Sequence, residues 1–258
     1  MLYVQIAIGQ NLNSFQGGGR VEGGNEVTGK PQRKYRERDD VTRGLGGKRG
    51  RNRGCVPERC GRVVFDQLVS GSEADALLKI AQQGLALGGS EGGASILDLH
   101  SGALSQGKNF VNIYKLDQAK GIFRKSDFII YKVVKTKIQH AVAHHFGVRA
   151  DALHLTHPTF FSRLTSAPAK TVHDEYWHPH VDKETYESFH YTSLLYLTDY
   201  GHDFQGGRFV FVDKDNSNKT VEPRKEKVSS GTRYAITVSF TCDEKYAIDD
   251  PAIPMDAK

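Results

Sequence analysis

The sequence predicts an α+β fold of the jelly-roll type, a double-stranded β-helix with flanking N-terminal helices. Two observations predict it. Apolar residues recur at helical spacing between residues 72 and 147, whereas short runs of β-branched and aromatic residues, divided by Gly, Asn, Asp or Pro, fill the chain from Leu155 onward. Helices that precede strands in this way favour a fold in which the helices pack on one side of antiparallel sheets.

Two helices are expected before the strands. The first begins at Ser72, where a carboxylate follows three residues later, and ends at Gly88-Gly89. The second begins near Ser126 and ends at Gly147. Each has a broad apolar face, formed by Leu77, Leu78, Ile80, Ala81 and Leu85 in the first and by Ile130, Val134, Ile138 and Val142 in the second.

Four strands are expected in the second half of the chain. They are short, rich in β-branched and aromatic residues, and bounded by turn-forming residues. The expected ranges are 155–164, 192–198, 208–213 and 233–241.

Residues 1–54 differ from the rest in composition and are expected to form a disordered leader, so that residues 55–258 form the folded domain. The leader is rich in Gly, Arg, Lys and Asn, with few large apolar residues to bury. Its charge balance is +6, which leaves −1 of the net charge of +5 for the folded part, so the folded part is nearly neutral and gives no reason to expect nucleic-acid binding. An RNA-binding role for residues 44–54 is the less favoured alternative. No apolar run approaches the roughly 20 residues of a membrane span.

Two of the three cysteines, Cys55 and Cys60, lie close together around a proline. A structural zinc site usually needs a second such pair, and the sequence has none. A local disulfide between Cys55 and Cys60 is the favoured interpretation, and two free thiols are the alternative. A disulfide would imply an oxidising compartment.

The segment from His173 to Lys183 holds three histidines and several carboxylates between two expected strands. Residues i and i+2 of a strand point to the same side, so His180 and Asp182 can present an imidazole and a carboxylate to one ion. These are two corners of the facial triad of non-heme Fe(II) oxygenases. His178 could compete with His180, but a supporting role beside the ligands is favoured for it.

Arg233 enters an apolar strand that runs to Phe240. An arginine that enters a barrel needs an anionic partner, and its guanidinium matches a carboxylate in bidentate geometry. The distal carboxylate of 2-oxoglutarate would suit this position. The alternative is an arginine that faces water at the end of a strand.

These motifs, with the segments 95–100, 193–197 and 206–209, resemble the prolyl 4-hydroxylase-type oxygenases that depend on Fe(II) and 2-oxoglutarate. The resemblance covers residues 55 to 254. It implies that His180 and Asp182 bind iron and that Arg233 binds 2-oxoglutarate. It also implies hydroxylation of a C–H bond, with release of succinate and CO2, and L-ascorbate to keep the iron reduced. Expected partners are a protein or peptide substrate, and relatives of this kind are membrane-anchored on the lumenal side of the endoplasmic reticulum.

The chain departs from the resemblance at the second iron-binding histidine. The resemblance places this histidine about ten residues before the cosubstrate arginine, where this chain has Pro223, and no histidine follows His202. The short stretch between Phe211 and Gly231 indicates an internal deletion, so the core is expected to lack a strand. Substitution by His190 or His202 is not favoured. The sequence therefore predicts either an oxygenase or a catalytically silent binding protein with the same fold.

Overall fold

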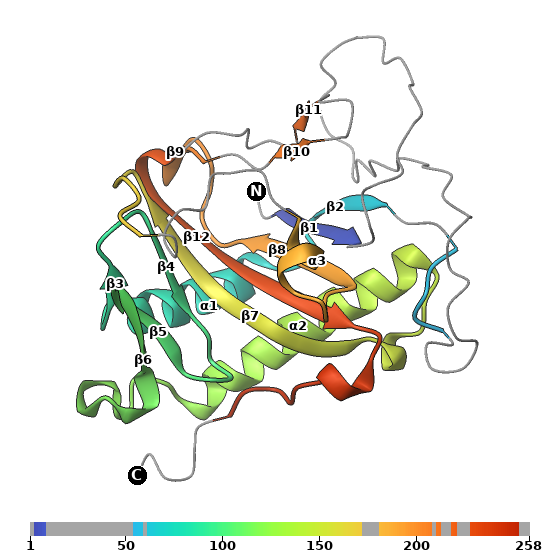
Figure 1. The fold of residues 1–258 in the computed structure, drawn as a ribbon, viewed down its shortest axis with the longest axis horizontal. Helices are drawn as coiled ribbons and strands as arrows, with labels where there is room; N and C mark the ends of the chain where they lie inside the picture. Colours follow the sequence, from blue (N-terminus) through green and yellow to red (C-terminus); the bar gives the residue numbers. More distant parts are fainter. Residues whose placement is uncertain are drawn as a thin grey trace.

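The computed structural model describes residues 3–8, 54–58, 61–171, 181–207, 210–212, 218–220 and 228–252. Most strands join one large sheet, and the two long helices lie behind it in Figure 1. The expected α+β jelly-roll class is confirmed. The two long helices precede the long strands in the chain, as the sequence predicts.

Both expected helices are present. Helix α1 (Gly71–Leu85) has Ser70 as its N-cap, two residues before the expected Ser72, because Ser70 accepts a hydrogen bond from Glu73 N and the Glu73 carboxylate accepts one from Ser70 N. Helix α2 (Lys125–Phe146) ends where Gly147 adopts φ 67°, a left-handed conformation that glycine takes without strain. The short helices are η2 (Ile113–Lys115), η3 (Asp117–Ala119), η4 (Ala150–Ala152), α3 (Asp182–Thr185) and η5 (Glu244–Tyr246).

The large sheet has the strand order β2-β1-β8-β12-β7-β4-β5-β3, with β6 paired to β5 and β9 paired to β12. Its strands are β1 (Tyr3–Ile8), β2 (Arg62–Asp66), β3 (Gly89–Ser90), β4 (Ala94–Leu97), β5 (Ala103–Gly107), β6 (Asn109–Asn112), β7 (His154–Thr165), β8 (Tyr191–Tyr196), β9 (Phe204–Gly206) and β12 (Val228–Thr241). A second, two-stranded sheet pairs β10 (Val210–Val212) with β11 (Asn218–Thr220). All pairs are antiparallel except β3 with β5.

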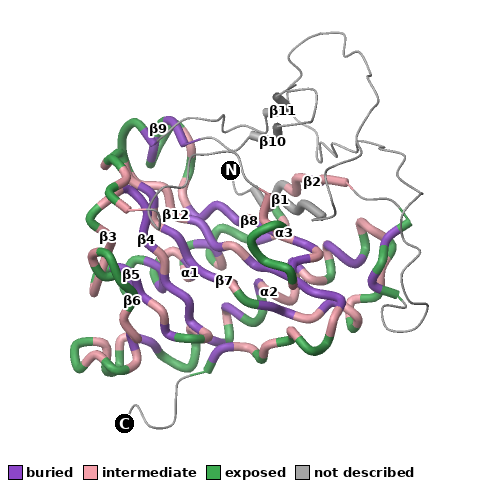
Figure 2. Tube along the Cα trace, in the orientation of Figure 1, coloured by how far each residue is buried: buried purple, intermediate pink, exposed green. Residues whose placement is uncertain are grey.

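The main core lies between the large sheet and helices α1 and α2. From β12, alternate residues Ile236, Val238 and Phe240 are at most 2% exposed. They join the apolar faces of the two helices, among them Leu77 and Ile138, in one cluster. Figure 2 shows the buried segments along the long strands. Because side chains alternate along a strand, the other face of β12 is left for different residues.

Within residues 1–54, the structure describes residues 3–8 and Gly54. Residues 3–8 form β1, which pairs with β8 on one side and with β2 on the other. The physical reason is the alternating apolar pattern of this segment, which suits an extended strand. Residues 9–53 lie outside the described residues.

The core sheet was expected to lack a strand and so to expose an edge. In the described part of the chain, both edges of β8 are instead paired, with β12 and with β1. The expected deletion between Phe211 and Gly231 stays a prediction, because residues 213–217 and 221–227 lie outside the described residues.

Cys55 forms a disulfide with Cys242, so the expected bridge from Cys55 to Cys60 is wrong. The two Cα atoms lie 5.6 Å apart although 187 residues separate the cysteines in sequence. Tyr191 Oη donates a hydrogen bond of 2.6 Å to Cys55 O, and Arg149 N donates one of 2.6 Å to Gly54 O. Tertiary folding thus brings Cys55 to the end of β12, which proximity in sequence could not indicate.

A partly buried polar network connects the C-terminal segment to α2. His100 Nε2 lies 2.8 Å from Tyr131 Oη, and its Nδ1 lies 2.9 Å from Asp249 O. Burial lowers the pKa of His100, while the nearby Asp98 carboxylate opposes this change. The neutral imidazole satisfies both contacts, because Nδ1–H donates to the carbonyl and Nε2 accepts from the tyrosine hydroxyl.

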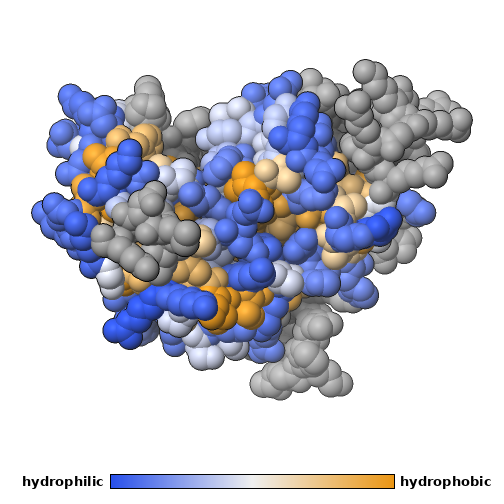
Figure 3. Space-filling model, turned by 90° about the horizontal axis from the view of Figure 1, so that it is seen from below, coloured by the Kyte–Doolittle hydropathy of each residue, from blue (hydrophilic) through white to orange (hydrophobic). Residues whose placement is uncertain are grey.

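The surface seen from below has separate apolar patches among charged and polar side chains (Figure 3). Across the described residues, large exposed apolar side chains include Ile129, Val133 and Phe110. None of the described helices combines the length and apolar character required to cross a membrane.

Loss of the disulfide is expected to destabilise the protein. Cys242→Ser and Cys55→Ser should each lower the free energy of unfolding by about 2–5 kcal/mol, because the unfolded chain gains the freedom of a long loop. Urea unfolding under oxidising conditions measures this loss. Cys60→Ser is the control and should unfold as the wild type does. Equal losses from Cys60→Ser and Cys55→Ser would show that the two neighbouring cysteines pair instead.

Stability is expected to fall as the pH drops through the range in which histidine titrates. The pKa of His100 is lower in the folded protein, so folding favours its neutral form. The resulting stabilisation is complete above the unfolded pKa of about 6.5 and is lost as the pH falls toward the folded pKa. Urea unfolding at pH 7.5 and pH 5.5 should show a smaller pH effect in His100→Gln than in the wild type. An equal effect in both proteins would exclude His100 as a source.

Candidate functional site

Arg233 lies near the start of β12, where β9 folds back onto the same strand. Gly231 has φ 75°, and a Cβ atom there would lie 2.1 Å from Asp203 O. Gly207 has φ 61°, and a Cβ atom there would lie 2.6 Å from the Val228 side chain. Both positions therefore require glycine for this close approach of β9 to β12.

This approach gives the half-buried Arg233 a fixed partner on one side of its guanidinium. Arg233 Nη1 donates a hydrogen bond of 2.6 Å to Gly207 O. Arg233 Nε is buried and has no hydrogen-bond partner among the described residues. The backbone carbonyl thus orients the guanidinium while one donor is left for another group.

Tyr196, at the end of β8, lies beside Arg233. Its ring centroid is 5.5 Å from Arg233 Cζ, within the range of a cation–π contact. Its hydroxyl is buried and has no hydrogen-bond partner in the described chain. Burial raises the pKa of Tyr196, although the charge of Arg233 opposes the change, so the hydroxyl keeps its proton at neutral pH.

The strand register explains why these two residues meet. Tyr196 stands opposite Ala235 in the β8–β12 pair, and Arg233 is two residues from Ala235, so all three lie on one face of the sheet. This face is opposite to the one covered by α1 and α2. A small apolar cluster surrounds the position, formed by Ala94, Leu164, Tyr196, Phe204 and Val228.

Two donors that have no partner among the described residues lie in apolar surroundings, and such donors suit an anion. A buried donor without a partner costs about 1–3 kcal/mol, which a hydrogen-bonding ligand would offset. A carboxylate has enough acceptor positions for both Arg233 Nε–H and the Tyr196 hydroxyl. The residues present therefore fit the distal carboxylate of 2-oxoglutarate. Tyr196 lies in the expected strand 192–198, but the sequence gives no strand register that would place this tyrosine beside Arg233.

Asp182 is the first residue of the short helix α3, not part of a strand as the sequence suggested. Its backbone oxygen accepts a hydrogen bond of 2.7 Å from Tyr186 N. Burial raises the pKa of Tyr186, and the nearby Asp182 carboxylate adds to this effect. Asp182 is half-buried. His180 and the alternative ligand His178 lie outside the described residues.

The described residues do not by themselves form a metal site. Within them, no three His, Cys, Asp or Glu residues gather in a way that could hold an ion. Asp182 is thus the one expected iron ligand that the described part of the chain contains. One carboxylate alone is not a sufficient set of ligands for Fe(II).

The two substitute histidines have other partners. His190 Nδ1 lies 3.0 Å from Ser188 O and 3.3 Å from Cys242 N, next to the disulfide. Burial lowers the pKa of His190, and the charge of Lys183 adds to this effect. His202 is exposed, and its Nδ1 lies 2.8 Å from Asp203 Oδ1. These contacts favour neither residue as the second iron-binding histidine.

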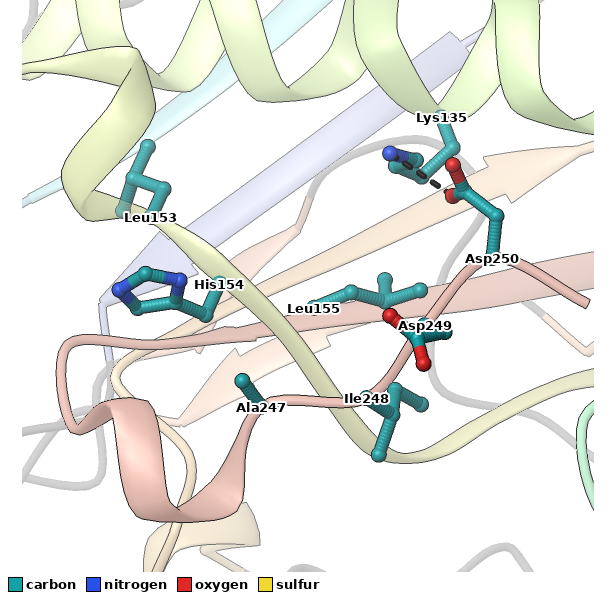
Figure 4. Close-up of a pocket in the computed structure, with 8 residues that line it drawn as sticks. All are labelled: Lys135, Leu153, His154, Leu155, Ala247, Ile248, Asp249 and Asp250. Carbon is teal, nitrogen blue, oxygen red and sulfur yellow. Dashed lines mark ion pairs between the residues drawn. The ribbon is translucent and has the colours of Figure 1, made fainter.

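A pocket of about 310 Å³ lies between α2, the start of β7 and the C-terminal segment (Figure 4). His154 stands at one end, and Lys135 meets Asp250 at the other in an ion pair of 2.8 Å. Lys132 also contacts Asp250, at 3.2 Å. None of its lining residues is Arg233, Tyr196 or Asp182, so this pocket is separate from the carboxylate position.

Sequence comparison gives the chain close relatives, although no protein-family model matches it. Four curated relatives share the name "2-oxoglutarate and iron-dependent oxygenase domain-containing protein 3". The one from Xenopus tropicalis is 55% identical over 215 residues, which are 76% of this chain and 68% of the relative. The one from Rattus norvegicus is 54% identical over 218 residues, 78% of this chain and 69% of the relative. The one from Homo sapiens is 53% identical over 219 residues, 78% of this chain and 68% of the relative. The chain therefore belongs to the family of 2-oxoglutarate and iron-dependent oxygenase domain-containing protein 3.

Proposed function

We propose that the chain is an Fe(II)- and 2-oxoglutarate-dependent dioxygenase that hydroxylates a C–H bond of a protein or peptide side chain. The observation that carries the proposal is the buried pair of donors, Arg233 Nε and Tyr196 Oη, left without partners by the described residues. The name of the relatives supports the same cofactor pair. A prolyl 4-hydroxylase-like reaction is part of the proposal.

Bound iron and 2-oxoglutarate would supply the oxidising chemistry, in which one oxygen atom of O2 would enter the substrate as a hydroxyl group and the other would enter succinate, with release of CO2. L-ascorbate is proposed as the reductant that maintains Fe(II). The protein contributes binding, orientation and exclusion of water.

Arg233 and Tyr196 hold the distal carboxylate in this proposal. Arg233 Nε–H and the tyrosine O–H donate to its oxygens, while Gly207 O fixes the guanidinium through Nη1. Phe204 and Val228 are at most 2% exposed and keep the position apolar. Low local polarity strengthens a charged hydrogen bond, so the apolar surroundings raise affinity for the dicarboxylate.

His180 and Asp182 are proposed to hold the iron. Asp182 offers a carboxylate and His180 an imidazole, the two ligand types that Fe(II) oxygenases combine. The resemblance requires a second histidine, and neither His190 nor His202 has contacts that favour this role. A catalytically silent protein that binds 2-oxoglutarate through Arg233 and Tyr196 is therefore the second candidate function.

The proposed location is the lumenal side of the endoplasmic reticulum, on or near the membrane. The disulfide between Cys55 and Cys242 supports an oxidising compartment, because such bonds are rare where thiols are kept reduced. This disulfide joins distant parts of the fold.

Replacement of Arg233 is expected to weaken the binding of 2-oxoglutarate while the protein still folds. Arg233→Ala should reduce the affinity for N-oxalylglycine, an inert analogue, by about 2–5 kcal/mol, because a charged contact is lost from a partly buried site. Tyr196→Phe should reduce the binding free energy of N-oxalylglycine by about 1.5–3 kcal/mol. Arg233→Lys should bind the analogue better than Arg233→Ala but less tightly than the wild type, because an ammonium lacks the planar fork of the guanidinium. Calorimetry measures the affinities.

The control for this series is Arg163→Ala. Arg163 donates to Leu85 O and Ser95 Oγ next to α1, so its loss removes an equal charge at another place in the fold. Its affinity for N-oxalylglycine should equal that of the wild type. If Arg233→Ala bound the analogue as tightly as Arg163→Ala does, the carboxylate position would be wrong.

The metal site is tested by binding first and turnover second. His180→Ala should weaken Mn(II) binding by at least about tenfold, as the loss of even a supporting partner can, whereas His202→Ala should bind as the wild type does. Succinate formation is then followed with ascorbate and candidate peptides. Peptide-dependent succinate supports the dioxygenase. Tight N-oxalylglycine binding without any succinate supports the silent protein and contradicts our first proposal.

A further inference from the structure

The N-terminal strand β1 occupies an edge of the sheet that would otherwise be open. It pairs antiparallel with β8 from Val4↔Leu195 to Ile8↔Tyr191. On its other side it pairs with β2 from Tyr3↔Asp66 to Ala7↔Arg62. The edge strand β2 therefore joins the sheet through β1 (Figure 1).

The register aligns the apolar residues of β1 with a buried row of β8. Leu195, Ser193 and Tyr191 of β8 are each at most 1% exposed, and they stand opposite Val4, Ile6 and Ile8. Gln5 instead stands opposite Leu194, which belongs to the other row of β8. A shift by one residue would exchange the two sets, so the sequence alternation specifies this register.

Without β1, the outer edge of β8 would present unpaired backbone groups. Side chains of β8 belong to the main core. The edge of β8 therefore cannot be exposed to water in the way that the edge of a surface hairpin is. An open edge of a buried sheet accepts any extended chain of fitting alternation. The edge is therefore a binding surface with a defined ligand chemistry: an extended segment with apolar residues at every second position.

The strand that fills this edge comes from outside the folded domain in sequence. Residues 9–61 separate β1 from β2, and residues 9–54 are rich in Gly, Arg and Asn. Each residue added to a long connection increases the entropy cost of loop closure only slightly, but such a connection does not bind the strand rigidly to the domain. Residues 3–8 are thus held mainly by their backbone pairing and by the effective concentration that attachment to the same chain provides.

We propose that the outer edge of β8 is a strand-docking site and that residues 3–8 occupy it as a detachable strand of the same chain. Docking orders β8, which ends at Tyr196 beside Arg233. This consequence rests on the proposed function: release of β1 should loosen the position that holds the distal carboxylate. The docking itself needs neither iron nor 2-oxoglutarate.

The test uses the full chain and two matched variants. Ile6→Lys places a charge opposite the buried Ser193, whereas Gln5→Lys places the same charge opposite Leu194 in the other row of β8. Ile6→Lys should speed amide hydrogen exchange in residues 191–196 by at least about tenfold, because an unpaired charge next to a buried row is costly. Gln5→Lys should exchange as the wild type does. Equal exchange in all three proteins would overturn the proposal.

A labelled peptide of residues 2–10 then serves as the added strand. Measured by fluorescence anisotropy without metal or 2-oxoglutarate, it should bind the Ile6→Lys chain at least about tenfold more tightly than the wild type, because the edge is then open. It should also restore slow exchange in residues 191–196. A peptide that itself carries Ile6→Lys should not bind. Ile6→Ala, which opens the edge less, provides the same comparison if Ile6→Lys does not fold.

The outcomes separate the docking site from the proposed function. Failure of the peptide to bind any variant would exclude a strand-docking edge, whatever the fate of 2-oxoglutarate binding. A dimer of the full chain that the peptide dissociates would show that a second copy supplies the strand, and would overturn the assignment to the same chain. In a third outcome, the peptide binds and slows amide exchange as expected, but the affinity for N-oxalylglycine is the same with and without β1 docked. This outcome would uphold the docking site and exclude only its effect on Tyr196.

Discussion

The pairing of β12 with β7 on one side and β8 on the other determines most of this structure. One register of β12 sends Ile236, Val238 and Phe240 into the helix-covered core. The same register sends Arg233 to the opposite face. Because side chains alternate with a period of two, a slip of one residue would bury the arginine among the helices and expose the core. The hydrophobic core thus fixes the position of the functional candidate.

The surroundings of Arg233 carry a polar cost that the fold tolerates. Among the described residues, Arg233 Nε and Tyr196 Oη are buried and have no hydrogen-bond partner, and such groups are rare in stable interiors. Two glycines, Gly207 and Gly231, allow β9 to approach closely enough for one carbonyl to hold the guanidinium. A local arrangement that lowers stability while it orients a charged group is typical of a binding site.

Two segments from the first part of the chain, one around Cys55 and one formed by β1, attach to the central strands β12 and β8. The disulfide fastens Cys55 to the end of β12, and hydrogen bonds from Tyr191 and Arg149 hold the backbone around it. Strand β1 covers the outer edge of β8. Both contacts join segments that lie far apart in sequence. They also tie the ends of β8 and β12 to segments outside the jelly roll.

The sequence by itself determined the fold class, the two long helices and most of the long strands. Their signals are local: the apolar spacing around Leu77 and Ile138, and the alternation from Ile236 to Phe240, follow from helix and strand periodicity. It also singled out Arg233 from its place at the start of an apolar strand. Only the tertiary structure decided that Tyr196 lies beside Arg233, that Cys55 pairs with Cys242, and that residues 3–8 join the sheet. Each of these depends on which strands become neighbours and in which register, and no local pattern encodes a contact between segments so far apart.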